Sequence, residues 1–348
     1  MSLRRVSFFG LGYVGLCTAV CFAKKGFKVV GVDIDEEKIK GIMEGEAPFY
    51  EPDLEPLLRD CLRKGTLTCT TDPREGVTSS TVSFITVGTP SRPDGSIDLR
   101  YIRLVAKDIG EALREKAGYH LVVVKSTVTP GTTLDVAKPI LEDASGRKCG
   151  PDLGLCMNPE FLREGRAIQD VLNPDRIIIG EYDEKSGDLL EGLYRRFHEG
   201  EMPPVLRMNI PTAELVKYAN NAFLATKISL INTIANICER IPGVDVTTVA
   251  EGIGLDPRIG RAFLNAGLGF GGSCLPKDLR ALIRLAESLG EDPSLIQAAL
   301  DINEGQVERV LYLLKMALGV ESLKGLHVAV LGLSFKPGTD DVRESRSM

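Results

Sequence analysis

The sequence is poor in aromatic and imidazole side chains. Its 348 residues include no tryptophan and only three histidines, His120, His198 and His327, which are far apart in the sequence. The eight cysteines include no Cys-x-x-Cys pair. Structural zinc sites and disulfide frameworks need closely spaced cysteines or histidines, so we expect neither a metal site nor disulfides.

Concentrated positive charge is also missing. The net charge is −6 at pH 7, and no dense Lys/Arg block occurs. Nucleic-acid binding needs basic side chains gathered against phosphates, so we expect no nucleic-acid partner. No apolar stretch is long and continuous enough to cross a membrane. This composition is better suited to a small-molecule partner.

The N-terminus allows two interpretations. Arg4 and Arg5 precede an apolar run that ends in small residues, a pattern that resembles a secretory signal peptide. The same run contains Gly-x-Gly-x-x-Gly at residues 10–15, which a cleaved leader has no reason to carry. We therefore favour a cytoplasmic protein, because reduced thiols persist in that compartment.

The first apolar strand leads into a dinucleotide-binding pattern. The stretch VSFFGLGYVG places Gly10, Gly12 and Gly15 between a short strand and a helix expected over residues 13–25. A second strand, KVVGVD, ends at Asp33, about where an acid binds the adenosine ribose hydroxyls in such β-α-β units. The combination predicts an NAD site, and the carboxylate disfavours the ribose phosphate of NADP. The alternative is a glycine-rich turn of another α/β protein.

Further apolar runs predict strands within residues 82–90, 120–128, 152–159 and 176–180, with amphipathic stretches between most of them. This alternation predicts an α/β fold with a doubly wound parallel sheet. Ligands bind beyond the carboxyl ends of such strands, which makes candidates of Thr89, Ser126, Thr127 and Glu160. Each of them alone is more often a turn residue or a helix cap.

A single long helix is expected over residues 211–241, which contain no internal glycine or proline. Lys217 and Asn221 are four residues apart in it and share one face. One interpretation is that the lysine extends to solvent. The other is that both side chains point into a pocket and stabilise negative charge on an oxygen.

Cys274 has an unusual setting in FGGSCLPKD, behind two glycines and just before an expected helix. A helix N-terminus and the nearby Lys277 both favour the thiolate. No histidine lies near it in sequence, which disfavours a Cys-His hydrolase. A thiol combined with NAD suggests aldehyde oxidation, in which a thiohemiacetal loses hydride and the resulting thioester is hydrolysed to an acid.

The motifs together resemble the nucleotide-sugar 6-dehydrogenases, typified by UDP-glucose and GDP-mannose dehydrogenases. The resemblance covers essentially the whole chain and rests on an ordered series: FGLGYVG, Asp33, FYEPDLE, VGTPSRPDGSIDLRYI, KSTVTPGTT, NPEFLREG, ELVKYANNAFLATKISLINTIA, RIGRAFLNAGLGFGGSCLPKD and LGLSFKPGTDDVRES. It implies oxidation of a sugar C6 alcohol to a carboxylate with two NAD and without release of the aldehyde.

The resemblance also implies a domain organisation. Residues 1–203 would form a Rossmann-like NAD-binding domain and residues 204–320 a central helical dimerisation and catalytic domain. Residues 321–348 would form the first strand of a second, truncated Rossmann-like domain that supplies much of the nucleotide pocket in the family. A homodimer through the long helix is implied as the minimum assembly.

The catalytic residues that the resemblance implies are Cys274, Lys217, Asn221, Asp278, Glu160 and Thr127. The thiol is the nucleophile, and the lysine and asparagine stabilise an oxyanion. The aspartate orders the catalytic water, the threonine helps to hold it, and the glutamate is a second acid in thioester hydrolysis. How the proton transfers divide among Lys217, Asp278 and Glu160 stays open.

Two further sets of residues match the binding motifs of the family. The implied NAD-binding residues are Gly10, Gly12, Tyr13, Val14, Gly15, Asp33, Lys38, Thr89, Thr127, Glu164, Lys277 and Arg343. The implied residues for the nucleotide sugar are Phe161, Leu162, Lys217, Asn221, Arg258, Asn265, Phe270, Gly271 and Lys336. In the family the arginine that matches Arg258 reaches in from the neighbouring subunit.

The substrate stays open at this level. The segment RIG-x-x-FLNAG resembles UDP-glucose dehydrogenases, whereas VGTPSRPDGSIDLRYI and LGLSFKPGTDD resemble GDP-mannose enzymes. GFGGSC differs from the VGGHC form of the N-acetylmannosamine branch, which we place third. We favour UDP-glucose over GDP-mannose. Two other classes compete: an NAD alcohol dehydrogenase that stops at the aldehyde and gives Cys274 no role, and an NAD-binding dimer without turnover.

Overall fold

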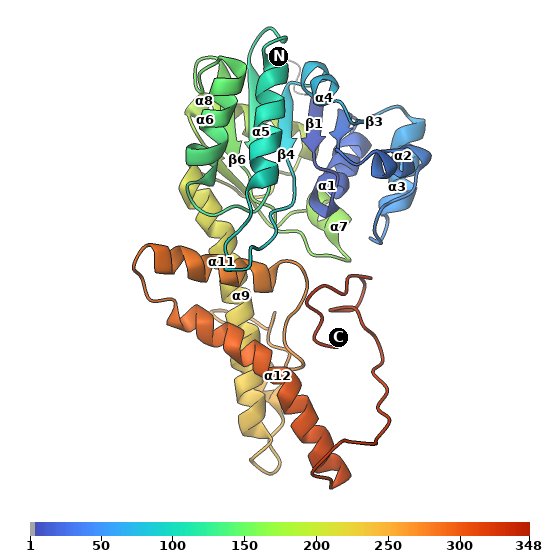
Figure 1. Cartoon of the computed structure of the whole chain (residues 1–348), viewed down its shortest axis with the longest axis vertical. Coiled ribbons are helices and arrows are strands. Elements are labelled where there is room, and N and C mark those ends of the chain that lie inside the picture. Colours follow the sequence, from blue (N-terminus) through green and yellow to red (C-terminus); the bar gives the residue numbers. More distant parts are fainter. Residues whose placement is uncertain (1–3) are drawn as a thin grey trace. The chain divides into compact units, whose positions relative to one another are not determined.

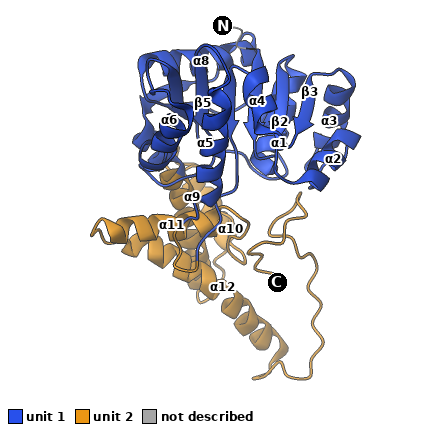
Figure 2. Cartoon of the chain, turned by 45° about the horizontal axis from the view of Figure 1, so that its top comes forward, with its two compact units in different colours: residues 1–92, 97–217 blue, residues 93–96, 218–348 orange. Residues whose placement is uncertain are grey.

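The computed structural model describes residues 4–348, so residues 1–3 of the predicted first domain lie outside the described range. The chain divides into two compact units (Figure 2): unit 1 runs to residue 92 and continues over residues 97–217, and unit 2 comprises residues 93–96 and 218–348. The division at residues 203 and 320 stays a prediction. Within residues 4–348 no helix is both long enough and apolar enough to span a bilayer.

One sheet forms the centre of unit 1. Its strand order is β3-β2-β1-β4-β5-β6-β7-β8. The bounds are β1 Arg5–Phe9, β2 Lys28–Val32, β3 Leu67–Thr70, β4 Val82–Ile85, β5 His120–Val124, β6 Leu153–Met157, β7 Ile177–Glu181 and β8 Val205–Asn209. The α/β class and the six predicted strands are confirmed. The sequence analysis missed β3 and β8, which are short and only partly buried.

The prediction that all strands run parallel is wrong at one place, because β7 pairs antiparallel with β6. The connection between them contains only the six-residue helix α7 (Ala167–Leu172). The rest of the connection, residues 158–176, is irregular.

Helices flank this sheet (Figure 1). Besides α7, unit 1 contains α1 Tyr13–Lys24, α2 Glu36–Glu44, α3 Leu54–Arg63, α4 Pro73–Ser79, α5 Arg100–Leu113, the short π-helix η1 Thr133–Ala137, α6 Lys138–Ser145 and α8 Glu184–His198. Helices α4, α5 and α6 pack in sequence on one another, and α1 packs with α3 and α7. Val6 and Phe8 of β1 share a buried core with α1 and α8, as the period of two along a strand requires.

Phe22 of α1 is the centre of an aromatic cluster in that core. Its side chain is fully buried. Its ring lies 4.6 Å from that of Phe197, 5.0 Å from Phe27 and 5.6 Å from Phe8, measured between centroids. The cluster joins α1 and α8 to β1, and thereby fixes the helix that follows the glycine-rich turn.

Unit 2 is helical. Helix α9 (Ile210–Cys238) begins in unit 1 and continues into unit 2, where it is followed by α10 (Val246–Gly254), α11 (Leu275–Ser288) and α12 (Ser294–Leu318). The predicted long helix is confirmed, with its ends shifted from 211 and 241. One buried cluster of this unit contains Ala225 of α9, Phe270 of the loop before α11, and Leu279 of α11.

The strand expected within residues 321–348 does not form, because a lone strand has no neighbour for its backbone hydrogen bonds. The end of the segment instead contacts the rest of unit 2. The backbone N–H of Gly272 donates to the Arg343 carbonyl at 2.9 Å, and Arg280 pairs with Glu344 at 2.9 Å. Residues 321–348 are thus irregular in this structure, and the start of a second Rossmann-like domain stays a prediction.

Replacing Phe22 by alanine should lower the free energy of unfolding by about 3–5 kcal/mol, because it leaves a cavity inside the aromatic cluster. Chemical denaturation followed by circular dichroism measures the change. Leu206→Ala, at a side chain 57% exposed on β8, is the matched control and should stay within about 0.5 kcal/mol of the parent. Equal losses in the two variants would contradict the role given to the cluster.

Candidate active site

A pocket lies at the carboxyl ends of β1, β2 and β4 in unit 1. Residues of the glycine-rich turn and of the loops after β2 and β4 line it: Gly10, Gly12, Asp33, Ile34, Lys38, Thr86, Val87 and Gly88. Parallel strands direct their following loops to this edge of a sheet, which is where ligands of doubly wound folds bind. Four predicted cofactor residues, Gly10, Gly12, Asp33 and Lys38, are therefore brought together.

The turn between β1 and α1 depends on the absence of side chains. Gly10 has φ +97°, and a Cβ there would lie 2.8 Å from Cγ1 of Val87. A Cβ on Gly15 would lie 1.9 Å from the Gly10 carbonyl oxygen, so only glycine allows this approach of helix to turn. At Gly12 a Cβ would meet nothing within 4 Å. The open space beside Gly12, at the N-terminus of α1, suits a pyrophosphate.

Asp33 connects the glycine-rich turn to the loop after β2. Its buried carboxylate accepts the Leu11 backbone N–H at 2.7 Å. The Lys38 ammonium donates to both of its oxygens at 3.0 Å. The acid at the end of β2 is thus held at the pocket, in the place from which it can accept ribose hydroxyls.

Tyr13 and Thr89, two further predicted cofactor residues, bind other loops. The Tyr13 hydroxyl donates to Glu51, and burial together with that carboxylate raises the pKa of Tyr13. The Thr89 hydroxyl donates to the Thr127 carbonyl at 2.8 Å. The loops that follow β4 and β5 are thereby joined.

Glu51 is a residue whose role the sequence analysis missed. Its buried carboxylate accepts the backbone N–H groups of Gly165 and Ala167, each at 2.7 Å. It therefore positions the segment that contains Glu164, a predicted cofactor residue. In the sequence this residue is visible only as an acid within the motif FYEPDLE, and the sequence does not show which backbone N–H groups it binds.

A buried ion pair lies beyond the carboxyl end of β6. Lys217 Nζ and Glu160 Oε1 are 2.9 Å apart, with side chains 5% and 6% exposed. Lys217 therefore does not extend to solvent, which excludes the first of the two interpretations. The other Glu160 oxygen accepts the Leu162 backbone N–H at 2.6 Å. Burial acts to raise the pKa of Glu160, but Lys217 and this N–H outweigh it and the pKa is lowered.

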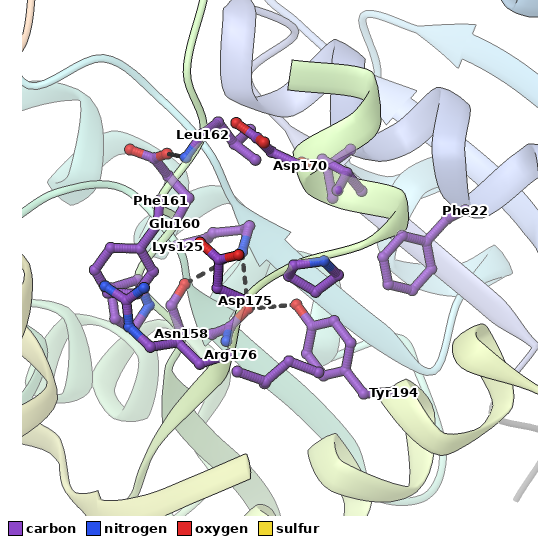
Figure 3. A pocket seen from close by; sticks show the side chains of 15 residues that line it. Phe22, Lys125, Asn158, Glu160, Phe161, Leu162, Asp170, Asp175, Arg176 and Tyr194 are labelled. Atoms are coloured by element: carbon purple, nitrogen blue, oxygen red, sulfur yellow. Dashed lines mark hydrogen bonds between the residues drawn. The ribbon is translucent and has the colours of Figure 1, made fainter. Parts of the chain in front are cut away.

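Phe161, Arg176 and Lys125 line the same pocket as Glu160 (Figure 3). Lys217 Nζ lies 5.4 Å from the ring centroid of Phe161, and Arg176 stacks on the same ring at 3.9 Å. Lys125, which the sequence analysis did not single out, donates to Asn158 Oδ1 at 2.9 Å. Its signal was a lysine directly after an apolar strand, within KSTVTPGTT.

Glu214 fixes the loop after β5 to the first turns of α9. It is fully buried and accepts backbone N–H groups from Gly131 at 2.6 Å and Thr133 at 2.8 Å. Burial, opposed by these N–H groups, raises the pKa of Glu214 to about 7. The residue thereby links the loop that contains Thr127 to the helix that contains Lys217.

In unit 2, Cys274 is the N-cap residue of α11, and its side chain is exposed. One turn later, the buried carboxylate of Asp278 accepts the Asn221 amide at 2.7 Å. Lys277 Nζ lies 2.7 Å from the other Asp278 oxygen. The start of α11 thus carries an exposed thiol and, one turn later, a buried carboxylate that binds an amide donor. Asn221 and Lys217, predicted as a pair, each bind a different carboxylate.

The other predicted residues of unit 2 are more dispersed. Phe270 is buried, and its backbone N–H and carbonyl both bond to the Asn303 amide, at 2.6 and 3.0 Å. A Cβ on Gly271 would lie 2.4 Å from the Glu344 carbonyl oxygen. The exposed members of the set are Asn265, Arg258, which pairs with Asp256, and Arg343, which pairs with Asp341. Lys336 lies over the Phe335 ring.

Two family models match this chain. The NAD binding domain of the UDP-glucose/GDP-mannose dehydrogenase family matches residues 4–198, and the central domain of that family matches residues 211–305. The chain belongs to the UDP-glucose/GDP-mannose dehydrogenase family. It is an NAD-dependent nucleotide-sugar dehydrogenase, and NAD is its cofactor.

Individual relatives are similar over nearly the whole chain. A UDP-glucose 6-dehydrogenase of Haloferax volcanii is 49% identical, over 99% of this chain and 79% of its own length. A GDP-mannose 6-dehydrogenase of Pseudomonas aeruginosa is 44% identical, over 98% and 76%. The structure of a UDP-glucose dehydrogenase from Pyrobaculum islandicum has a TM-score of 0.92 at 46% identity, and the match covers 99% of this chain and 77% of that one.

The pocket of unit 1 fits the NAD of this family. The open space at Gly12 leaves room for a pyrophosphate, and the Asp33 carboxylate lines the same pocket. The resemblance inferred from the sequence is therefore confirmed at the level of family and cofactor. The roles of the individual site residues stay predictions.

Asp33→Ala should weaken NAD binding by about 1.5–3 kcal/mol, because it removes a charged acceptor from the ribose. Fluorescence titration or calorimetry measures the dissociation constant, and the labelling rate of Cys274 with iodoacetamide should stay unchanged. Asp60→Ala, which removes one negative charge from α3 of the same unit, is the control and should bind NAD normally. Unchanged NAD affinity in the Asp33 variant would overturn the ribose assignment.

Proposed function

We propose that this protein oxidises the C6 alcohol of UDP-glucose to the carboxylate in two steps, through a thiohemiacetal and a thioester on Cys274. The observation that carries the proposal is the exposed Cys274 thiol at the N-terminus of α11, one turn before the buried Asp278–Asn221 pair. GDP-mannose is the second candidate, since enzymes for both sugars are similar to this chain. The motif RIG-x-x-FLNAG favours UDP-glucose.

The proposed reaction uses the thiol to retain the aldehyde. After the first oxidation, Cys274 Sγ adds to the aldehyde carbon and forms the thiohemiacetal. Loss of a second hydride from that carbon gives the thioester, which water cleaves to the acid and the free thiol. When bound in the pocket at Gly12 and Asp33, NAD would supply the hydride acceptor for each oxidation. A reducing compartment, the cytoplasm, suits a mechanism that needs this thiol reduced.

Polar side chains would stabilise the charges that develop on oxygen. Lys217 would supply a cation, and Asn221 would supply an amide donor, to stabilise the oxyanion in the thiohemiacetal and thioester steps. Asp278 would orient the hydrolytic water, with Thr127 as a further hydrogen-bond partner. Glu160, paired with Lys217, would hold or release a proton during hydrolysis. Phe161 and Leu162, which adjoin that acid, would contact the sugar nucleotide.

The test is the yield of NADH per sugar consumed, with UDP-glucose and GDP-mannose offered separately. The proposal predicts two NADH per UDP-glucose. Cys274→Ala should abolish acid formation while its NAD affinity stays nearly unchanged, because the thiol acts on the sugar and not on the cofactor. Cys238→Ala, which removes a buried thiol at the end of α9 in the same unit, is the matched control and should retain both NADH per sugar.

The other outcomes separate the alternatives. Two NADH per GDP-mannose and none from UDP-glucose would reassign the substrate. One NADH per sugar, with the aldehyde released, would leave a simple alcohol dehydrogenase and remove the covalent step. Undiminished acid production by Cys274→Ala would also exclude the covalent step on Cys274. Bound NAD without turnover of either sugar would identify an NAD-binding protein.

We also propose that the chain forms a homodimer through α9. Phe223, Leu230 and Ile237 are seven residues apart on this helix and are 67%, 53% and 50% exposed. A spacing of seven places them on one helix face. A row of large apolar side chains at the surface is typical of an interface.

Leu230→Asp should convert this dimer to a monomer, because it places a charge in the middle of the apolar row. Analytical ultracentrifugation or light scattering measures the mass. Leu289→Asp, at a leucine that is 69% exposed after α11, is the control and should remain dimeric. A parent protein that is already a monomer would exclude the proposal.

A further inference from the structure

Lys125 is a buried cation that none of the proposed steps uses. It follows β5 directly, and only 6% of it is exposed. Its Nζ donates to the Asn158 side-chain oxygen at 2.9 Å and lies 3.5 Å from the Asn158 backbone oxygen (Figure 3). Asn158 is two residues before Glu160, so this lysine binds the segment that carries the proposed acid.

The Asn158 amide is itself held in one orientation. Its nitrogen donates to the Ile178 carbonyl of β7 at 2.8 Å, and its oxygen accepts the Tyr194 hydroxyl at 2.5 Å. The side-chain oxygen thus receives donors from β5, through Lys125, and from α8, through Tyr194. Because the Asn158 side chain is fixed in this way, the Lys125 ammonium that binds it is held next to the segment that carries Glu160.

The Lys125 charge acts on the ion pair between Glu160 and Lys217. The pKa of Lys125 is lowered to about 8: burial is the largest cause, Glu160 opposes the change and Lys217 adds to it. In turn, Lys125 is one of the groups that lower the pKa of Glu160. The other charged groups on the walls of the same cavity are Asp175, Arg176 and Asp170, which pairs with Arg163 at 2.5 Å.

A purely structural role explains this lysine poorly. Burying an ammonium is unfavourable, and a neutral side chain in its place would avoid that desolvation. Tyr194 also donates to the Asn158 oxygen, so this oxygen would keep a hydrogen-bond partner without the lysine. The buried Lys125 is better explained by its effect on the charge state of Glu160, which its positive charge favours in the ionised form.

We propose that Lys125 is a positioning residue for Glu160: its ammonium, fixed by Asn158, holds the 158–160 segment and keeps the Glu160 carboxylate ionised beside Lys217. The inference rests on the proposed function, in which Glu160 takes part in thioester hydrolysis. Lys125 acts through Glu160, and its effect should appear in the pH dependence of turnover.

The kinetic test compares Lys125→Met with Lys125→Arg. Lys125→Met removes the charge and should shift the acidic limb of the kcat–pH profile to higher pH by about 1 unit. A neighbouring opposite charge typically shifts a carboxylate pKa by about 1–3 units, and we expect the lower end of this range. Lys125→Arg keeps the charge, and its side chain adjoins the cavity, so it should retain the parent profile. Tyr194→Phe removes the other donor to Asn158 without changing charge and should also keep the parent limb.

Melting temperatures against pH test the buried charge without any substrate. The folded-state pKa of Lys125 is about 8, below its ordinary value of 10.5. The unfavourable burial of the charged form is therefore fully present below pH 8 and is lost as pH rises toward 10.5. Lys125→Met should gain melting temperature over the parent at pH 7, and this gain should shrink by pH 10.

The two measurements separate this proposal from the proposed function. Absence of NADH from the parent protein would overturn the proposed function alone, and melting would still report the buried charge. A melting difference that does not change with pH would overturn the inference about Lys125 whether or not the protein turns over. Unshifted kinetics in Lys125→Met, or an equal shift in Lys125→Arg, would overturn it in an active enzyme.

Discussion

The buried ion pair between Lys217 and Glu160 is the interaction on which the site of unit 1 depends. Two charges removed from water are tolerated only when they satisfy each other, and removal of one partner typically costs 3–5 kcal/mol. The pair joins the loop after β6 to the first turns of α9. Glu214 adds a second link from the same helix to the loop after β5. The start of α9 is therefore anchored to the sheet by carboxylates on both sides of the connection.

The cofactor pocket works by a different principle, because its main features are backbone and empty space. Gly10 and Gly15 allow contacts that any Cβ would block, and Gly12 leaves the end of α1 accessible. Asp33 then links this turn to β2. In unit 2 the proposed nucleophile is likewise presented by backbone geometry, since Cys274 lies at the start of α11 and not within an apolar core.

Much of the fold followed from local pattern. Six strands, the helix after the glycine-rich turn and the long α9 were predictable, because apolar periodicity and the absence of helix breakers act within a few residues. The antiparallel direction of β7 was not predictable, since the apolar pattern of a strand does not show which way it pairs with its neighbours. The edge strands β3 and β8 carry little apolar signal. The strand expected within residues 321–348 does not form, because a strand needs a neighbouring strand for its backbone hydrogen bonds and the local apolar pattern does not show whether one is present.

The sequence by itself determined the family, the cofactor and the identity of the candidate residues, because glycines at fixed spacing, an acid after β2 and a thiol between glycines and a helix start are local features. Only the tertiary structure decided which of them meet. Lys217 is paired with Glu160, Asn221 with Asp278, and Lys125, Glu51 and Glu214 have defined partners distant in sequence. Such pairings arise where separate loops converge at one edge of a sheet or at one helix end, and their energies depend on burial, which a single chain segment does not encode.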